Sequence, residues 1–294
     1  MMREKNINTM KDEKLEWKKG VPFVLNFHLT KVCNMKCAFC FGGFKESEKL
    51  LSKEQWILLI KKIGKSTKHL KDRRINFAGG EPLLYPHLAE LIRIAKREGF
   101  KTSMITNGSL LTEKFLDEVR DCIDMIGISI DSVSNELNEK SGRMTKYGVL
   151  TVNDYIARCN WISERGIKLK VNTVIHKYNV NQDMASLLEN VSIERWKVLR
   201  MLKIKNENAD AFPWYPTKEK FDDFVSRHQK YNPVVEDNED MISAYLFVSP
   251  SGYLMDNSEG EMVSAASLIE RSFTEALESI SFDVEVFSKR YNAG

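Results

Sequence analysis

Three of the five cysteines in this 294-residue chain, Cys33, Cys37 and Cys40, lie together in the stretch CNMKCAFC. Thiolates are soft ligands that bind zinc, copper(I) or iron–sulfur centres. A structural zinc site normally takes four protein ligands, and a four-iron cluster usually takes four cysteines. The spacing C-x3-C-x2-C supplies three, with no fourth cysteine in range. Three thiolates on a four-iron cluster would leave one iron open, and a ligand bound there could receive an electron directly.

Another candidate metal ligand is His28, in the extended run VPFVLNFHLT that precedes the cysteines. It could complete a zinc site, but in an alternating strand it is equally suited to a pocket or core position. Cys122 and Cys159 lie in segments with apolar periodicity, so we expect both to be small buried side chains. An odd number of cysteines with three of them clustered favours metal or redox chemistry over disulfides.

A second motif, INFAGGEPLL at residues 75–84, follows a strand-like run. Gly79 and Gly80 would let the backbone approach a ligand closely, and Glu81-Pro82 would fix the turn. An ordinary turn between a strand and a helix would explain the glycines, but not their pairing with the cysteine motif.

Together these motifs resemble those of the radical S-adenosylmethionine enzymes, whose signature is C-x3-C-x2-C with an aromatic residue just before the last cysteine. The resemblance implies a [4Fe–4S] cluster on Cys33, Cys37 and Cys40, and S-adenosylmethionine on the open iron as the source of a 5'-deoxyadenosyl radical. It also implies cofactor contacts at the ends of successive strands, although several of these positions could equally be turn or surface residues. The cofactor-binding residues predicted in this way are Phe39, Gly79, Gly80, Glu81, Asn107, Ser129, Asp131 and Arg143.

Strand-like and helix-like segments alternate along the first two thirds of the chain, and this order favours a parallel sheet with right-handed crossovers. We therefore expect an α/β fold, a partial (β/α)6 barrel of the radical S-adenosylmethionine type, whose strand ends carry the chemistry. The predicted strands are 23–29, 74–78, 101–105, 125–130, 167–175 and 195–202, and the predicted helices are 53–63, 88–98, 113–120, 152–165 and 183–190.

The sequence pattern divides the chain into three parts. Residues 1–20 form a polar N-terminal segment, and residues 21–205 form the partial barrel. Residues 206–294 form a C-terminal extension that is expected to close the barrel mouth and contribute to the substrate pocket. Within it, 218–231 reads as an amphipathic helix, and ISAYLFVSPSGYLM reads as two strand-like halves around a turn.

Composition and charge limit the partners. Charged residues make up 29% of the chain and the net charge is +3, which gives no strong attraction to nucleic acid or to an anionic membrane. No window approaches the roughly 18 apolar residues of a membrane span, and the N-terminus has no signal-peptide core. We expect a cytoplasmic protein that binds neither nucleic acid nor membrane.

Three pairs of polar residues lie two positions apart on predicted strands, so the members of each pair point to the same face. Cations that face the inside of a barrel lose hydration energy unless they bind an anion, and a triphosphate suits both their charge and their number. The alternative is that these cations point outward and are solvated. The pairs are Arg74 with Asn76, Lys170 with Asn172, and Arg195 with Lys197.

The second half of the chain resembles one particular family within these enzymes. The stretches 169–184 and 195–202 are similar to the corresponding strands of the viperin-like enzymes, and RINFAGGEP, ISIDS, SGR and FSKR occur in matching order from about Phe23 to Arg290. This implies conversion of a nucleoside triphosphate, CTP before UTP or GTP, to its 3'-deoxy-3',4'-didehydro analogue, an antiviral or antiphage chain terminator. A flavodoxin- or ferredoxin-type protein would supply electrons.

By the same resemblance, Arg74, Asn76, Lys170, Asn172, Arg195 and Lys197 bind the nucleotide, and Tyr245 and Lys170 are the candidate catalytic residues. Tyr245 falls where the family has the tyrosine proposed to quench the product radical, although a tyrosine in a strand is more often a core residue. The chain departs from the animal enzymes at Arg74 and Ala78, where they have lysine and serine. Nucleotides with different bases share the same phosphate contacts, so the sequence does not identify the base.

Two other functions are compatible with the cysteine motif. One is a radical S-adenosylmethionine enzyme that acts on a different phosphorylated substrate, such as the cyclase that works on GTP. That cyclase has a second, C-terminal cysteine cluster, whereas no cysteine follows Cys159 here. The other is a non-catalytic iron–sulfur protein, whose cluster would show no spectroscopic response to S-adenosylmethionine.

Overall fold

The computed structural model describes residues 16–42 and 49–292 and shows one ten-stranded sheet in the order β10-β9-β8-β1-β2-β3-β4-β5-β6-β7. Strands β1 to β7 are parallel to their neighbours, and β8 is parallel to β1, whereas β9 and β10 are antiparallel. The strands are β1 (Phe23–His28), β2 (Arg73–Ala78), β3 (Lys101–Thr106), β4 (Met125–Ser129), β5 (Lys168–Ile175), β6 (Arg195–Arg200), β7 (Val234–Glu236), β8 (Phe247–Val248), β9 (Tyr253–Asp256) and β10 (Val263–Ser267).

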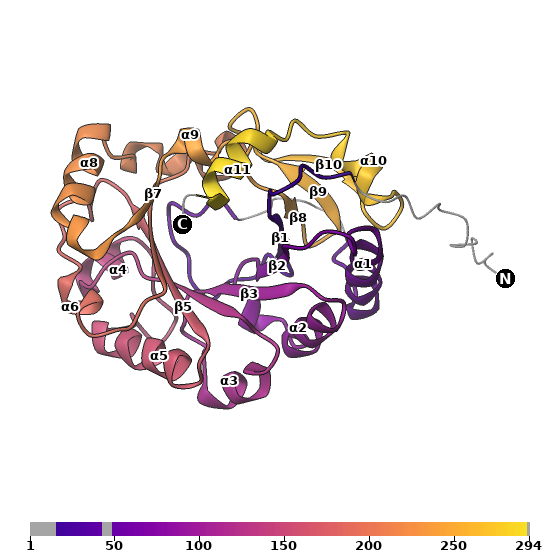
Figure 1. Cartoon of the computed structure of the whole chain (residues 1–294). Coiled ribbons are helices and arrows are strands. Elements are labelled where there is room, and N and C mark those ends of the chain that lie inside the picture. Colours follow the sequence, from indigo (N-terminus) through magenta and orange to yellow (C-terminus); the bar gives the residue numbers. More distant parts are fainter. Residues whose placement is uncertain (1–15, 43–48, 293–294) are drawn as a thin grey trace.

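Helices lie on the outer side of the curved sheet, where α1, α2, α3, α5 and α6 follow the arc of strands (Figure 1). The helices are α1 (Lys53–Ser66), α2 (Leu88–Arg97), α3 (Glu113–Val119), α4 (Asn135–Lys140), α5 (Val152–Glu164), α6 (Ala185–Leu188), α7 (Lys205–Asn208), α8 (Lys218–Arg227), α9 (Asn238–Met241), α10 (Phe273–Leu277) and α11 (Val284–Asn292). Short 3-10 helices occupy η1 (Pro82–Leu84), η2 (Ala209–Trp214) and η3 (Gln229–Tyr231).

Alternation along the strands separates a helix-facing side from an inner side. In β5, Leu169 and Val171 are buried in the main hydrophobic core, while Lys170 and Asn172, which alternate with them, are only partly buried. The helices present matching apolar faces, as in α1, where Trp56 and other residues at helical spacing pack into the same core. The apolar core therefore lies between sheet and helices, which leaves the polar side chains for the inside of the barrel.

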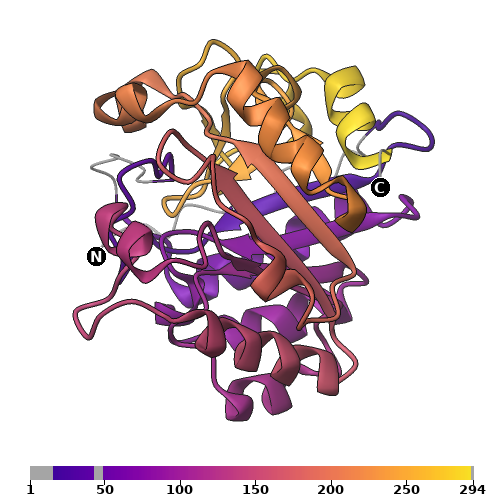
Figure 2. The same ribbon diagram turned by 90° about the vertical axis from the view of Figure 1, so that its left-hand side faces the viewer.

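The C-terminal extension adds strands at both edges of the six-stranded unit. Strand β7 pairs with β6 at one edge, and β8 pairs with β1 at the other. Strands β8 to β10 and helices α10 and α11, in light orange to yellow, lie next to β1 (Figure 1), while Figure 2 shows β5 and β6 crossing the front of the molecule. In the strand order, β10 and β7 are the two ends, so the sheet does not close by hydrogen bonds in the described part of the chain.

The predicted fold is confirmed as a partial barrel, and each predicted strand and helix of its first six units is present with ends shifted by a few residues. The two strand-like halves of the extension are β8 and β9, and the amphipathic helix is α8 followed by η3. The predicted N-terminal segment lies largely outside the described residues, and the boundary at residue 205 stays a prediction. Among the described residues, no helix is long and apolar enough to span a membrane.

Candidate active site

The cysteine loop after β1 is held from two sides by backbone hydrogen bonds. The amides of Gly80 and Glu81 donate to the carbonyls of Thr30 and Val32, at 2.6 and 2.9 Å. On the other side, the amide of Lys36 donates to the carbonyl of Gly142 at 3.0 Å, and the amide of Ala38 donates to that of Ser141 at 2.9 Å. The GGEP turn and the SGR turn therefore enclose the loop that carries the three thiols.

Glycine is required where these segments touch. A Cβ atom on Gly80 would lie 2.2 Å from the carbonyl oxygen of Val32, and one on Gly142 would lie 2.1 Å from that of Lys36. Gly79 combines a φ of +140° with a contact of 2.6 Å to the carbonyl of Thr30. Real Cβ atoms do not approach backbone oxygens this closely, so a side chain at any of the three positions would displace the cysteine loop.

All three thiols line one cavity, and protein donors reach the first of them. The amide of Met35 donates to Cys33 Sγ at 3.4 Å, and Asn107 Nδ2 lies 3.8 Å from the same sulfur. Burial raises the pKa of Cys33 and Cys40, and it raises the pKa of Cys37 to about 12. A metal that binds this set must therefore displace thiol protons, as metal ligation by cysteine normally does.

The spacing of the thiols favours a cluster over a single ion. Within residues 16–42 and 49–292, no three His, Cys, Asp or Glu side chains lie close enough to bind one metal ion. Cysteines on a four-iron cluster each bind a different iron and so lie farther apart than the ligands of one zinc ion. The residues present fit a [4Fe–4S] cluster held by Cys33, Cys37 and Cys40, and the zinc alternative with His28 gains no support.

Glu81 is fully buried and is used to join two strand ends. Its carboxylate accepts hydrogen bonds from Thr106 Oγ1 at 2.6 Å, from the amide of Asn107 at 2.8 Å and from the amide of Leu83 at 3.1 Å. Burial raises the pKa of this carboxyl group. Glu81 therefore fixes Asn107, which in turn reaches Cys33 and donates to Asn34 Oδ1 at 2.9 Å.

Asp131 and Arg143 form a buried ion pair between the end of β4 and the SGR turn. Asp131 Oδ1 also accepts the amide of Val174 at 2.7 Å, and Arg143 Nη1 donates to the carbonyl of Ser129 at 3.1 Å. Burial lowers the pKa of Arg143, but the Asp131 carboxylate, together with smaller effects of Cys37 and Tyr155, raises it by more in sum, so the guanidinium stays protonated. The cation also lies 5.9 Å from the Phe39 ring centroid, within cation–π range.

The cavity has a volume of about 530 Å³ and runs along the inside of the barrel. Of the predicted site residues, only the carboxylates Glu81 and Asp131 are absent from its wall in the described structure. Both have protein partners instead, so their direct contact with a cofactor stays a prediction. The predicted residues on the wall are Cys33, Cys37, Phe39, Cys40, Arg74, Asn76, Gly79, Gly80, Asn107, Ser129, Arg143, Lys170, Asn172, Arg195, Lys197 and Tyr245.

The amide of Asn76 is fixed from both neighbouring strands. Its Nδ2 donates to Asn26 Oδ1 at 3.0 Å, and its Oδ1 accepts from Ser103 Oγ at 2.9 Å. Asn26 in turn donates to the carbonyl of Leu246 at 3.2 Å, just before β8. Asn26 and Ser103, which the sequence analysis missed, thus hold a polar layer across β1, β2 and β3.

The cations of β5 and β6 are adjacent, because Lys170 pairs in register with Arg195, and Asn172 pairs with Lys197. These four side chains line the cavity, so the prediction that they face inward is confirmed and the solvated alternative is wrong. Lys197 also forms a buried ion pair with Glu236 of β7. Glu236 was missed in the sequence because it lies in a three-residue strand with no recognisable pattern.

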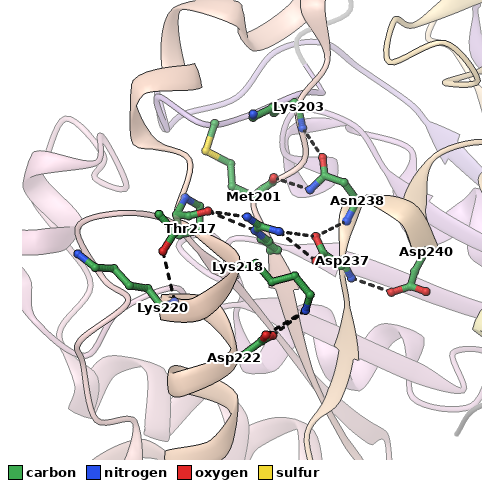
Figure 3. A network of polar contacts seen from close by, with 11 residues as sticks. Met201, Lys203, Thr217, Lys218, Lys220, Asp222, Asp237, Asn238 and Asp240 are labelled. Carbon is green, nitrogen blue, oxygen red and sulfur yellow. Dashed lines mark hydrogen bonds and ion pairs between the residues drawn. The ribbon is translucent and has the colours of Figure 1, made fainter.

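A polar network fixes the outer end of β6 against the start of α9 (Figure 3). Asn238 Nδ2 donates to the carbonyl of Met201 at 3.0 Å, and Asn238 Oδ1 accepts the amide of Lys203 at 3.0 Å. Asp237 pairs with Arg200 at 3.1 Å. Since Asp237 directly follows Glu236, this network also holds the carboxylate that contacts Lys197.

Aromatic rings form the wall beside β8. Tyr245 stacks on Phe247 with a centroid distance of 4.8 Å, and Phe247 meets His28 edge to face at 5.3 Å. All three line the cavity, and Tyr245 is half-buried. Burial lowers the pKa of His28 to about 3, so its imidazole is neutral at physiological pH.

Comparison with known proteins connects this geometry to a family. Residues 27–191 match the model of the radical SAM superfamily. An S-adenosylmethionine-dependent nucleotide dehydratase of Lacinutrix mariniflava is 35% identical over 277 residues, which cover 90% of this chain and 57% of that protein. A protein of the same name from Flammeovirga pacifica is 32% identical over 274 residues, covering 90% of this chain and 93% of that one.

Among solved structures, Streptococcus suis SuiB bound to S-adenosylmethionine superposes with a TM-score of 0.66 at 15% identity, over 91% of this chain and 68% of that one. At this identity the likeness concerns the fold alone. The chain spans little more than half the length of the Lacinutrix relative and almost all of the Flammeovirga relative.

Proposed function

The chain belongs to the radical S-adenosylmethionine superfamily and, within it, to the viperin-like nucleotide dehydratases, and from this premise we propose that it dehydrates a ribonucleoside triphosphate to the 3'-deoxy-3',4'-didehydro analogue. CTP is the foremost candidate, before UTP and GTP. The observation that supports this proposal best is the single cavity that joins three cysteine thiols to inward-facing cations of β2, β5 and β6.

When bound, the [4Fe–4S] cluster and S-adenosylmethionine supply a 5'-deoxyadenosyl radical that takes the 4' hydrogen of the ribose. Cys33, Cys37 and Cys40 would hold the cluster at the carboxyl ends of the strands. The SGR turn and the GGEP turn keep the cysteine loop in place there, and Arg143 is available as a cation for the carboxylate of S-adenosylmethionine.

The cations deeper in the barrel would bind the triphosphate. Lys170 and Arg195 are register partners on the cavity wall, and Arg74 faces the same cavity from β2. Charged donors inside a protein bind phosphate oxygens more strongly than they would in water. This arrangement would hold the nucleotide with its phosphates away from the cysteines and its ribose toward them.

Loss of the 3' hydroxyl as water consumes one proton, and one electron completes the C3'–C4' double bond. Tyr245 lines the cavity with a phenol group that can supply both, and Lys170 is the second candidate for proton transfer. The phenoxyl radical left on Tyr245 would be reduced by the external electron donor and reprotonated from solvent before the next turnover. We assign the external electrons to a flavodoxin- or ferredoxin-type donor and the protein to the reducing cytoplasm, where thiols stay free for cluster assembly. The didehydro nucleotide would act in antiviral or antiphage defence.

The test is to supply CTP, UTP, GTP and ATP separately to the anaerobically reconstituted protein with S-adenosylmethionine and a reductant. Mass spectrometry should find a nucleotide lighter by one water molecule, formed together with 5'-deoxyadenosine. Production of 5'-deoxyadenosine with every nucleotide left unchanged would refute the proposed function and favour a different phosphorylated substrate.

A further inference from the structure

The cavity continues along the predicted triphosphate site to the opposite end of the barrel. Pro22, Asp72 and Lys101 belong to its wall, and they lie at the starts of strands β1, β2 and β3. The cysteines follow the end of β1. Because these strands are parallel, the two sets of residues lie at opposite openings. Side chains of Lys101 and Asp72 are 53% and 52% exposed, so this end of the cavity reaches solvent.

Lys101 belongs to the same row of inward-facing residues as the predicted phosphate contacts. It is the register partner of Arg74 on the neighbouring strand, and both line the cavity. It lies two residues before Ser103, or about 7 Å along β3, on the side away from the cysteines. Lys101 therefore extends the cationic wall toward the solvent-exposed opening, beyond the layer formed by Asn76 and Ser103.

Asp72 gives this end of the cavity a distinctive charge pattern. It is the sole carboxylate on the wall among the described residues, and its Oδ1 lies 2.9 Å from Lys101 Nζ. Since both side chains are half exposed, their ion pair is weak and can be replaced. A phosphate group at this opening would meet the Lys101 ammonium together with the competing Asp72 carboxylate.

We propose that Lys101 binds the terminal phosphate of the nucleotide and so favours triphosphates, whereas Asp72 competes for the same ammonium and sets how strong this preference is. The inference rests on the proposed nucleotide substrate and adds a specificity-determining pair at the open end of its site. A monophosphate bound with its ribose toward the cysteines would end before Lys101, whereas a triphosphate would reach it. Only the longer ligand therefore gains the contact with Lys101, and only the longer ligand must displace Asp72 from it.

The test compares Lys101→Ala, Lys101→Arg and Asp72→Asn with the wild type, each with the cluster assembled and S-adenosylmethionine present. Calorimetry measures the dissociation constants of CTP, CDP, CMP and inorganic tripolyphosphate. Lys101→Ala should weaken the binding of CTP and tripolyphosphate about tenfold, equivalent to about 1.4 kcal/mol, and leave that of CMP unchanged. Lys101→Arg should retain the affinity, and Asp72→Asn should strengthen the binding of both triphosphate ligands.

Lys168→Ala is the matched control, because Lys168 is also a half-exposed lysine at the start of a strand and is paired with Glu194, yet it is absent from the cavity wall in the described structure. It should bind all four ligands like the wild type. Equal affinities of Lys101→Ala and the wild type for CTP, or an equal loss for CTP and CMP, would overturn the role of Lys101. A wild-type protein that binds tripolyphosphate but dehydrates no nucleotide would instead contradict the proposed function. The affinities of the Lys101 variants for tripolyphosphate would still test whether Lys101 binds phosphate.

Discussion

Lys197, on the wall of the cavity, forms a buried ion pair with Glu236 that joins β6 to β7, with side chains 5% and 3% exposed. Removal of one member of a buried ion pair is strongly destabilising, because the other charge stays desolvated and loses its counter-charge. The same lysine faces the predicted nucleotide site, so the pair links the stability of the protein to occupation of that site.

Glu236→Gln should therefore destabilise the protein by about 3 kcal/mol, because the buried charge of Lys197 loses the carboxylate of Glu236. A bound triphosphate would restore negative charge near Lys197, so CTP should raise the Tm of the variant more than that of the wild type. Differential scanning fluorimetry with and without CTP measures both effects. Glu194→Gln removes an exposed carboxylate that pairs with Lys168, and it should cost no more than about 1 kcal/mol. Equal stability of the two variants would contradict this role of the pair.

Replacing Cys33, Cys37 or Cys40 with alanine should abolish iron binding and 5'-deoxyadenosine formation, because each change removes one of three thiolate anchors. Iron analysis and product chromatography after anaerobic reconstitution measure these outcomes. Cys122→Ala and Cys159→Ala are the controls, since Cys122 packs against the hydrophobic core and Cys159 is buried within it. Turnover in any of the first three variants would exclude the assigned cluster site.

Lys170→Ala and Arg195→Ala should each weaken nucleoside triphosphate binding by about 1.5–3 kcal/mol, the range for hydrogen bonds to charged groups. Their effect on S-adenosylmethionine binding should be much smaller, because the predicted contacts of that cofactor lie at the other end of the strands. Titration calorimetry with each ligand separates the two. Unchanged nucleotide affinity in both variants would mean that the phosphates bind elsewhere.

Acid should destabilise the protein through His28. Its pKa is about 3 in the folded protein because it is buried, against an ordinary value of about 6.5 in the unfolded chain. Between these values the unfolded chain binds a proton that the native protein does not. The free energy of unfolding should therefore fall as the pH drops from about 6.5 toward 3, by at most ~1.4 kcal/mol per pH unit for this residue, and be fully retained above pH 6.5.

His28→Gln should reduce this pH dependence, as measured by urea unfolding near pH ~7.5 and pH ~5. His176, whose pKa is lowered to about 4 mainly by burial, contributes in the same direction and remains in the variant. Some acid sensitivity should consequently persist in His28→Gln. An identical pH profile for the variant and the wild type would show that His28 becomes protonated without unfolding.

The strands and helices that could be predicted are those that form because of residues within the same short segment of the chain. Strands such as β5 alternate buried apolar and inward polar residues, and helices such as α1 begin with a capping box at Ser52. Strands β7 and β10 could not be predicted from the sequence, because β7 has only three residues and β10 pairs irregularly with β9. Their formation depends on neighbours far away in the chain.

The same distinction applies to the site. Inward orientation of Lys170 and Arg195 followed from strand periodicity, since residues two apart share a face. The direction of Glu81 and Asp131 did not, because each lies at a strand end where the chain turns, and only the structure shows that they bind Thr106 and Arg143. The ion pair of Lys197 could not be predicted either, since Glu236 is 39 residues away in the sequence.

The ring of Tyr245 stacks on Phe247 with a centroid distance of 4.8 Å and lines the cavity. Phenylalanine would keep this packing and remove only the hydroxyl group. If Tyr245 delivers the proton and electron that complete the reaction, Tyr245→Phe should still bind S-adenosylmethionine and abstract the 4' hydrogen, but release much less didehydro nucleotide per 5'-deoxyadenosine. CTP labelled with deuterium at C4' allows both steps to be followed in one reaction.

Phe247→Leu is the matched control for Tyr245→Phe, because it disturbs the same stack and leaves the phenol in place. It should lower the overall rate without changing the ratio of didehydro nucleotide to 5'-deoxyadenosine. A Tyr245→Phe enzyme that kept the wild-type ratio would show that another group completes the reaction. Lys170, the other catalytic candidate on the same wall, would then be the residue to replace next, and Tyr245 would be a packing residue of the aromatic wall.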